Sequence, residues 1–475
     1  MRKIYLSFII YLLSLSPVEA QQRWTLDQCL EYAIVHNTGI RHLQNEQKRR
    51  EVKMQASKDA RWPKFQADMG GYVSTLHHAG NNNKIDANLS FANVALAGSV
   101  PLYTGNRLRG QIEVDKLSLL ASIEDVRGAE RNLKVQVATL YLQVLYEKGE
   151  MKIAHERLGV SRMLLQQARS LFEKGKRPES DTVEAAAIVS RDEALLTVAE
   201  GDILLSRLDL RQLLNLPDSV DFDICEPDDS TNTIPPLSPL AFYTQASSGH
   251  PALQSANYGI QQAQQGVKLA RSGYFPTLSL VGEIGSLWAT LGANASHGSR
   301  VPLLLPYGSL GGLSYHLGVE GDWKRKNFLN AIIGLKLSIP VFDAFRTKAR
   351  IRTAKINLED ARLAYDDARQ RTERDIRQAW QQAINALKRH EAEVKAEQSC
   401  ALAYRYALKR YNAGMATILD LSQSRQQWFA AAENALRTKY EYLIRKNVLD
   451  IQAQTGSQGV SPCCEAGLTR GSDPL

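Results

Sequence analysis

The chain has 475 residues, of which 44% are hydrophobic and 7% aromatic, and its formal net charge at pH 7 is +8. Acidic and basic residues are interspersed along helix-like stretches, a pattern typical of solvated helix faces and not of a nucleic-acid-binding stripe. The five cysteines (positions 29, 225, 400, 463 and 464) have neither the spacing of zinc ligands nor that of a disulfide framework. We therefore expect no nucleic-acid partner, no metal site and no cofactor.

The N-terminus has the features of a secretory signal peptide. Arg2 and Lys3 form its basic region, residues 4–15 its apolar run, and a small-x-small cleavage site ends at Ala20. The apolar run is shorter than the roughly 20 residues that a membrane-spanning helix needs. Residues 1–20 are therefore predicted to be removed, and the mature chain is predicted to be exported.

Two halves of the chain are related by a weak internal repeat. At a shift of 239 residues, Pro101 matches Pro340, Gly175 matches Gly414, and Asp181 matches Asp420. Upstream the shift is 213 residues, where Trp62-Pro63 matches Phe275-Pro276, so the second half contains an insertion of 26 residues. An ordered set of matched residues over more than a hundred positions favours a true structural repeat.

Each half is predicted to contain a helix, a hairpin of two strands and a long helical hairpin, in that order. In the first half (21–217) the strand hairpin covers about 63–102 and the helical hairpin about 105–215. In the second half (240–455) the corresponding elements cover about 276–341 and 343–454. Residues 218–239, rich in Asp, Pro, Ser and Thr, are interpreted as the linker, and 456–475 as a polar tail.

The stretch "LNAIIGLKLSIPVF", which begins at Leu329, alternates between apolar and polar residues and predicts a strand with one apolar face. Three weaker stretches bring the expected number of strands to four. Each is about ten residues long, which suits a tilted membrane-spanning strand, although a half-buried strand of a soluble sandwich alternates in the same way. The Gly- and Ser-rich connection at about 286–326, which holds the insertion, is expected to be a long exposed loop.

Four strands cannot close a barrel, and an open sheet edge is not tolerated in lipid. If these strands cross a membrane, several chains must therefore share one barrel, and closed cyclic oligomers are the simplest solution. Three chains with four strands each would form a barrel of twelve strands.

Two stretches, from Gly105 to Phe172 and from Asp343 to Tyr411, contain no proline and little glycine. A helix of that length would extend for about 100 Å, which is too long for a compact domain. Their apolar positions are small and are interrupted by charges. This pattern favours helices that lie side by side in the wall of a hollow tube, with a two-stranded coiled coil as the alternative.

A Gly-x5-Asp pattern follows each of these stretches. Gly175 and Gly414 are expected to end the helices in the left-handed conformation, which costs glycine least. Asp181 and Asp420 then lie at the start of the returning helix, where a carboxylate caps the helix or interacts favourably with its dipole.

Taken together, these features resemble the TolC family of outer-membrane efflux and secretion channels. The two most similar stretches are "LKLSIPVFDAFRTKARIRTAKINLEDA" (335–361) and "RYNAGMATILDLSQSRQQWFAAAENALRTKYEYLIRKNVLDIQAQTG" (410–456). The resemblance implies a mainly α fold with a small β part: a homotrimer with a twelve-stranded outer-membrane β-barrel and a periplasmic tunnel of twelve helices.

The same resemblance implies a passive exit duct of a tripartite efflux or type I secretion system, surrounded by outer-membrane lipid. It implies docking to a periplasmic adaptor protein and to an inner-membrane pump of the RND, ABC or a similar class. The family's entrance is narrowed at the helix tips, and by motif position the gate candidates are Asp420, Asp181, Tyr411 and Ser180. The adaptor-docking candidates are Gly175, Lys176, Arg177, Gly414 and Met415.

The tips also depart from the family pattern. Ala416 stands where some members have an arginine, and Gln423 where a second acidic residue can follow. The first tip is unusually basic, because Lys174, Lys176 and Arg177 surround its glycine. We therefore expect the interlock at the entrance to differ from that of the family. We also hypothesise that three copies of Asp420 form a ring there, with a simple helix cap as the alternative.

A periplasmic coiled-coil adaptor or scaffold protein without a membrane barrel is the alternative function. An enzyme is not expected, because the sequence contains no nucleophile elbow, no phosphate-binding glycine loop and no HExxH motif.

Overall fold

The computed structural model describes residues 22–453 apart from 81–82, 218–221, 226–243, 245–246, 248, 296–302, 311–312 and 320–324. The predicted signal peptide, most of the predicted linker and the C-terminal tail lie outside the described residues. The chain divides into two compact units. The first contains Met1–Glu46, Ile123–Ser255 and Asp366–Leu475, and the second contains Gln47–Ser122 and Ala256–Tyr365.

The helices follow the predicted repeat closely. Their bounds are α2 (Leu26–His36), α3 (Thr38–Asp59), α4 (Arg107–Glu173), α5 (Glu179–Leu214), α7 (Pro251–Arg271), α8 (Arg346–Asn412) and α9 (Ile418–Ala453). The long helices α4 and α8 each have 67 residues, and the returning helices α5 and α9 each have 36. Every bound of α8 and α9 lies 239 residues after the corresponding bound of α4 and α5. The structural repeat and the long helical hairpins are thus confirmed.

Among the described helices, none contains a stretch apolar and long enough to pass through a membrane.

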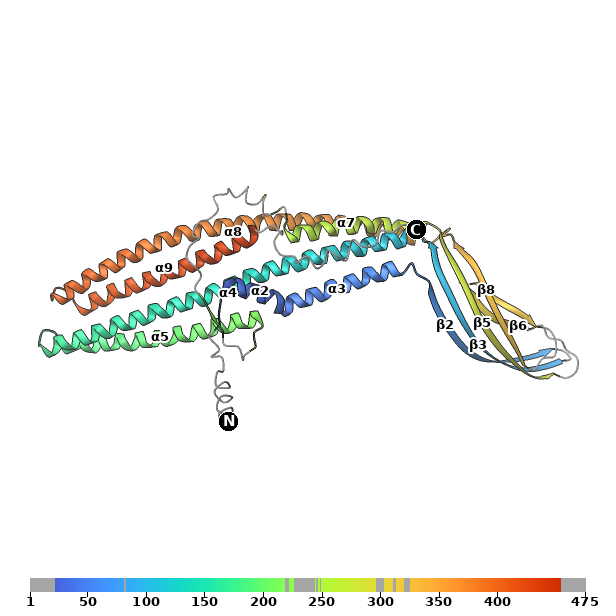
Figure 1. Cartoon of the computed structure of the whole chain (residues 1–475), viewed down its shortest axis with the longest axis horizontal. Helices are drawn as coiled ribbons and strands as arrows, with labels where there is room; N and C mark the ends of the chain where they lie inside the picture. Colours follow the sequence, from blue (N-terminus) through green and yellow to red (C-terminus); the bar gives the residue numbers. More distant parts are fainter. Residues whose placement is uncertain are drawn as a thin grey trace, which may run out of the picture. The chain divides into compact units, whose positions relative to one another are not determined.

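The second unit contains an antiparallel sheet in the order β2-β3-β5-β8 (Figure 1). Its strands are β2 (Lys64–Gly80), β3 (Asn83–Tyr103), β5 (Thr277–Ala295) and β8 (Arg325–Ser338). The pairing of β3 with β5 joins the two repeats into one sheet, with Leu96 opposite Ile284. The outer edges of β2 and β8 have no partner strand in the part of the chain that the structure describes.

The strands are longer than predicted. They contain between 14 and 21 residues instead of about ten. The expected loop at about 286–326 is also wrong, because β5 continues to Ala295 and a further hairpin of β6 (Leu303–Leu310) and β7 (Leu313–Val319) follows it. Glycine and serine within these extensions interrupt the apolar alternation, so a pattern search ends the strands too early.

One face of the sheet is apolar and exposed. Register places Leu96 of β3 between Ala67 of β2 and Ile284 of β5, and Ile284 next to Ala331 of β8. The large exposed side chains on this face are Phe65, Met69, Val73, Val94, Leu96, Ile284, Trp288, Leu329, Ile333, Leu335 and Leu337. Leu329 and Ile333 are 79% and 78% exposed. An apolar patch of this size on a single chain indicates a surface that contacts lipid or protein.

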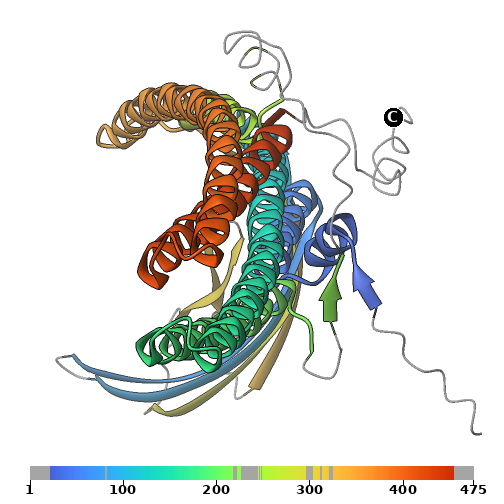
Figure 2. The same cartoon turned by 90° about the vertical axis from the view of Figure 1, so that its left-hand side faces the viewer.

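The first unit contains most of both helical hairpins, from Ile123 of α4 and from Asp366 of α8 onward. The α4/α5 hairpin and the α8/α9 hairpin lie side by side and end in two neighbouring turns (Figures 1 and 2). Near these turns, residues of all four helices form one apolar cluster. Its buried members are Leu164, Ala168, Ala185, Tyr411, Ala416, Ile418 and Leu421.

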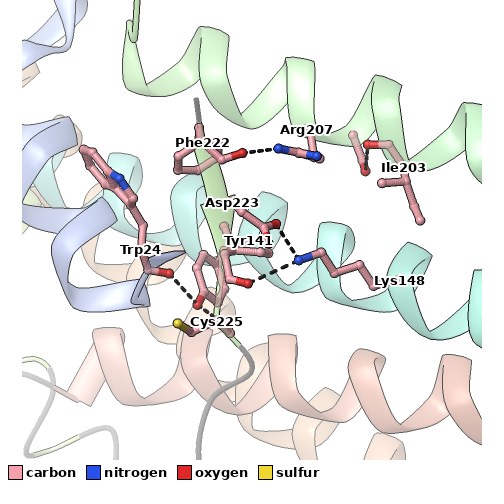
Figure 3. Close-up of polar contacts among 10 residues, drawn as sticks. Trp24, Tyr141, Lys148, Ile203, Arg207, Phe222, Asp223 and Cys225 are labelled. Carbon is pink, nitrogen blue, oxygen red and sulfur yellow. Dashed lines mark hydrogen bonds and ion pairs between the residues drawn. The ribbon is translucent and has the colours of Figure 1, made fainter. Parts of the chain in front are cut away.

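The first unit also contains a parallel pair of short strands, β1 (Gln22–Trp24) and β4 (Phe222–Ile224). The hydroxyl of Tyr141 on α4 lies 2.5 Å from the carbonyl oxygen of Cys225, to which it donates, and 3.1 Å from that of Trp24 (Figure 3). The ammonium of Lys148, two turns further along α4, lies 2.6 Å from the Asp223 carboxylate.

This strand pair corrects two expectations. The chain has more than four strands, and part of the predicted linker at 218–239 is ordered as β4. A strand of three residues is too short to show a hydrophobic period, and side chains of α4 hold it in place. It therefore leaves no signal in the sequence.

Candidate gate at the helix tips

The two tips have the same backbone. In the first, the amide of Gly175 donates to the carbonyl of Phe172 (2.8 Å) and that of Lys176 donates to Leu171 (2.9 Å). In the second, Gly414 donates to Tyr411 (3.0 Å) and Met415 to Arg410 (2.9 Å). Both patterns are Schellman motifs, which satisfy the last carbonyls of a helix.

Gly175 and Gly414 have φ angles of +65° and +78°. A side chain is strained in this left-handed region, so glycine is the favoured residue there. The prediction that these two glycines end the long helices is confirmed.

Side chains at the tips form a contact between the hairpins. The hydroxyl of Tyr411, at the end of α8, donates to the carboxylate of Asp181 on α5 at 3.4 Å. Tyr411 is 1% exposed and Asp181 is 8% exposed. Burial, and then the neighbouring carboxylate, raise the pKa of Tyr411 above its ordinary value. The phenol therefore remains a hydrogen-bond donor at neutral pH.

Arg177 of the first tip adds three further interactions to this contact. Its guanidinium lies over the Tyr411 ring, 4.7 Å from the ring centroid, and donates to the carbonyls of Tyr411 (3.2 Å) and Ala416 (2.9 Å). Arg177 thus fastens the first tip to the second by a cation–π contact and two hydrogen bonds. Position 416 has alanine where some family members have arginine, and the carbonyl of Ala416 accepts from an arginine of the other hairpin.

Asp420 has a different environment from Asp181. It is exposed, and its carboxylate accepts from the amide of Thr417 (2.9 Å) and from the Thr417 hydroxyl (2.7 Å). The Asp420 amide donates in return to the Thr417 hydroxyl at 3.1 Å. These reciprocal bonds form a capping box at the start of α9 and lower the pKa of Asp420.

The remaining candidates are exposed. Ser180 lies beside Asp181 but points to solvent, and Lys176 and Met415 occupy the same position in the two tips. Met415 is 68% exposed, which is high for a large apolar side chain. The structure therefore brings together Arg177, Asp181 and Tyr411, whereas Asp420 and Ser180 are exposed and take no part in this contact.

A buried ionic cluster lies deeper between the same hairpins. Arg425 of α9 lies 2.6 Å from Asp192 of α5, and both are 2% exposed. Arg157 of α4 lies 2.8 Å from Glu433 of α9 and 3.8 Å from Asp192. Both guanidiniums also lie over the ring of Phe429, at 5.3 Å and 5.8 Å.

The sequence analysis missed this cluster, although a signal was present. Arg425 lies four residues after the buried Leu421 and four before the buried Phe429, on the apolar stripe of α9. A charge on such a stripe requires a buried partner, which here is Asp192. No group of three or more His, Cys, Asp or Glu side chains able to hold a metal occurs among the described residues.

Comparisons with known proteins identify the family. The family model described as "Outer membrane efflux protein" matches residues 30–216 and 242–451. The outer membrane efflux protein BepC of Brucella suis is 21% identical over 73% of this chain and 69% of its own length. The alkaline protease secretion protein AprF of Pseudomonas aeruginosa is 24% identical over 68% of this chain and 62% of its own length.

The fold is similar to a solved structure of the family. The Campylobacter jejuni CmeC outer membrane channel has a TM-score of 0.69 at 17% identity, covering 91% of this chain and 86% of that one. The match to the family model sets aside the alternative of a periplasmic adaptor, and the family is one of efflux channels and not of enzymes. The chain belongs to the outer membrane efflux protein family, with the TolC-like fold, and its place is the outer membrane, from which it extends into the periplasm.

Proposed function

We propose that three copies of this chain form a passive exit duct through the outer membrane. The observation that carries this proposal is the sheet of four strands, which has an exposed apolar face and, among the described residues, no partner strand at the outer edges of β2 and β8. Unsatisfied backbone groups are too costly in lipid for such a sheet to remain open. Pairing of β8 of one copy with β2 of the next removes every edge when the ring closes.

Three copies, each with four strands, give a barrel of twelve strands in this proposal. The exposed face would contact lipid. The opposite face, with Gln66, Asp68, Ser279 and Lys336 among its residues, would line a water-filled lumen. The helical hairpins of the three copies would form a tunnel of twelve helices.

The helix tips are the proposed docking site for a periplasmic adaptor, which connects the duct to an inner-membrane pump of the RND, ABC or a similar class. Support comes from the exposed residues Gly175, Lys176, Gly414 and Met415 and from the name of AprF, which describes that relative as a protease secretion protein. Adaptor docking would compete with the contacts that Arg177 makes between the tips.

The same tips are the proposed gate. Arg177, Asp181 and Tyr411 hold the α8/α9 hairpin against the α4/α5 hairpin, and this arrangement corresponds to the closed state. Asp420 is exposed in the single chain, so three copies of it can form a ring of carboxylates around the aperture. The helix cap and the ring are compatible roles for one carboxylate.

Conductance of the full-length protein in planar lipid bilayers tests this function. We expect discrete single-channel steps that are rare at rest and become more frequent when Arg177→Gln releases the tips. Lys176→Gln is the matched control, because Lys176 is an exposed neighbour without these contacts. A correctly folded protein that gives no steps in wild-type or variant form contradicts the proposal.

A further inference from the structure

The start of α8 carries an unusual concentration of positive charge. Between positions 346 and 358 there are five basic residues and no acidic residue. These bases are Arg346, Lys348, Arg350, Arg352 and Lys355, and all five side chains are exposed. We call this group the α8 basic stripe.

The helix dipole does not explain these charges. The N-terminus of a helix is the positive end of its dipole, where bases are disfavoured and acids are favoured. The first turn of α8 contains no acid, and neither does that of α4, which begins with Arg107 and has Arg109 two residues later. Asp343, just before α8, accepts a hydrogen bond from the amide of Thr347 at 2.7 Å.

The later part of α8, where bases form ion pairs with acids of the same helix, differs from the α8 basic stripe. Further along α8, Arg371 pairs with Asp367 at 2.8 Å, and Arg377 pairs with Glu373 at 2.5 Å. By contrast, no ion pair is found for the members of the α8 basic stripe within the described residues. Among them, Arg346 acts on a nearby carboxylate, because its charge adds to the hydrogen bonds from Thr347 that lower the pKa of Asp343. The other four members of the stripe thus present positive charge at the surface of the chain.

Neighbouring segments of the second unit continue the charge. Each of them lies where a helix gives way to a strand or a strand to a helix. The exposed bases at these junctions are Lys58 in the last turn of α3, Arg61 and Lys64 after it, Arg107 and Arg109 at the start of α4, and Lys268 and Arg271 at the end of α7. Bases therefore gather at helix starts and helix ends alike, so their common feature is the junction with the sheet.

Exposed aromatic side chains occupy the same junctions. They are Trp62, Tyr103, Tyr274, Phe275, Phe342 and Phe345. The rings of Phe342 and Phe345 meet edge to face at 5.5 Å, and the ammonium of Lys348 lies 5.7 Å from the centroid of the Phe345 ring. Lys348, Arg352 and Lys355 are spaced to lie on one face of α8.

Aromatic belts mark the boundary between the hydrocarbon and the headgroups of a membrane, and bases beside them attract anionic headgroups. We propose that the α8 basic stripe, with the bases of the neighbouring junctions, binds the phosphate headgroups of anionic phospholipids at the periplasmic boundary of the outer membrane. This inference rests on the family's outer-membrane location and needs neither the gate nor the pump.

Spin-labelled lipids test it in bilayers that contain the full-length protein. The measured quantity is the association of labelled phosphatidylglycerol with the protein relative to labelled phosphatidylcholine. The wild-type protein should prefer phosphatidylglycerol, and 0.5 M NaCl should weaken that preference. Each base removed should lower the preference by roughly fivefold when the stripe governs binding. The triple variant Lys348→Gln/Arg352→Gln/Lys355→Gln should therefore lower it by on the order of a hundredfold, which abolishes the preference.

The matched control changes three exposed bases further along α8, in Lys388→Gln/Lys395→Gln/Arg405→Gln. The control should keep the wild-type preference at the same change in net charge. Equal preference in the wild-type protein and the stripe variant overturns the proposal. A stripe variant that changes the ion selectivity of the channel but keeps its lipid preference also overturns it, because the bases would then face the lumen.

Discussion

Asp181 and Asp420 occupy equivalent positions of the repeat but have different partners. Each lies six residues after the glycine of its tip, in a returning helix that starts at the equivalent position. Asp181 is buried and accepts from Tyr411 of the other hairpin, whereas Asp420 is exposed and caps its own helix through Thr417. The repeat thus reproduces the backbone without reproducing the side-chain contacts.

Two substitutions between the halves account for this difference. Pro178 stands where the second half has Thr417, and it makes no side-chain cap bond, so the Asp181 carboxylate has no capping partner beside it. Arg177 stands where the second half has Ala416, and these two equivalent residues contact each other across the hairpins at 2.9 Å. The first tip supplies the guanidinium that donates, and the second tip supplies the backbone carbonyls that accept.

The largest change in stability is expected at the buried ion pair between Arg425 and Asp192. Arg425→Met leaves the buried Asp192 with only the more distant guanidinium of Arg157, so the free energy of unfolding should fall by about 3 kcal/mol. Chemical denaturation followed by circular dichroism measures this change. Arg389→Met, which removes an exposed pair with Glu441, should cost less than about 1 kcal/mol. Similar losses in both variants would show that the buried cluster does not hold the hairpins together.

The next effect concerns the fastening of the two tips. Arg177→Gln removes a cation–π contact and two charged hydrogen bonds, which together stabilise the contact between the tips by about 2 kcal/mol. The open probability in planar bilayers should rise roughly thirtyfold. Tyr411→Phe removes one hydrogen bond and should have a smaller effect in the same direction. An unchanged open probability in Arg177→Gln would show that this contact does not keep the channel closed.

Substitution of Gly175 and Gly414 tests whether the backbones of the two tips have the same conformation. Gly175→Ala and Gly414→Ala place a side chain in the left-handed region, so each should lower the free energy of unfolding by about 1–2 kcal/mol. The added methyl group meets no atom within 4 Å at either position. The two losses should therefore be nearly equal, and a clear difference between them would contradict equivalence of the two turns.

The smallest expected change in the free energy of unfolding distinguishes the start of α9, which has a side-chain cap, from the start of α5, which has none. Thr417→Ala should cost about 1 kcal/mol, whereas Pro178→Ala removes no cap bond. The hydrogen bonds from Thr417 lower the pKa of Asp420 in the folded protein. The Asp420 carboxylate therefore contributes its full stabilisation of the fold at pH values above the pKa that this side chain has in the unfolded protein. That contribution should be lost as the pH falls through the folded pKa. Equal stability of Asp420→Ala, which has no acceptor for the Thr417 amide, and the wild-type protein at neutral pH would refute the cap.

Channel measurements on Asp420→Ala address the proposed ring. Loss of cation selectivity and of cation block is the expected result if three carboxylates surround the aperture. Unchanged selectivity and block would leave the helix cap as the role of Asp420.

Sequence reasoning predicted the helical hairpins well, because proline-free stretches and the glycines at 175 and 414 mark their ends. The apolar face of β8 was also predicted from its alternation. The contact of Arg177 with Tyr411 was not, because it joins residues 234 positions apart whose roles had been assigned separately. The β1–β4 pair and the β6–β7 hairpin were missed because short or glycine-rich strands show no period.

The central claim is that closed assembly of three chains turns an open sheet into a barrel. The mass of the full-length protein in mild detergent, measured by native mass spectrometry, tests it most directly. We predict a complex of three chains that resists dissociation when the detergent concentration is raised. A stable, folded monomer with the β2 and β8 edges accessible to hydrogen exchange would contradict the account.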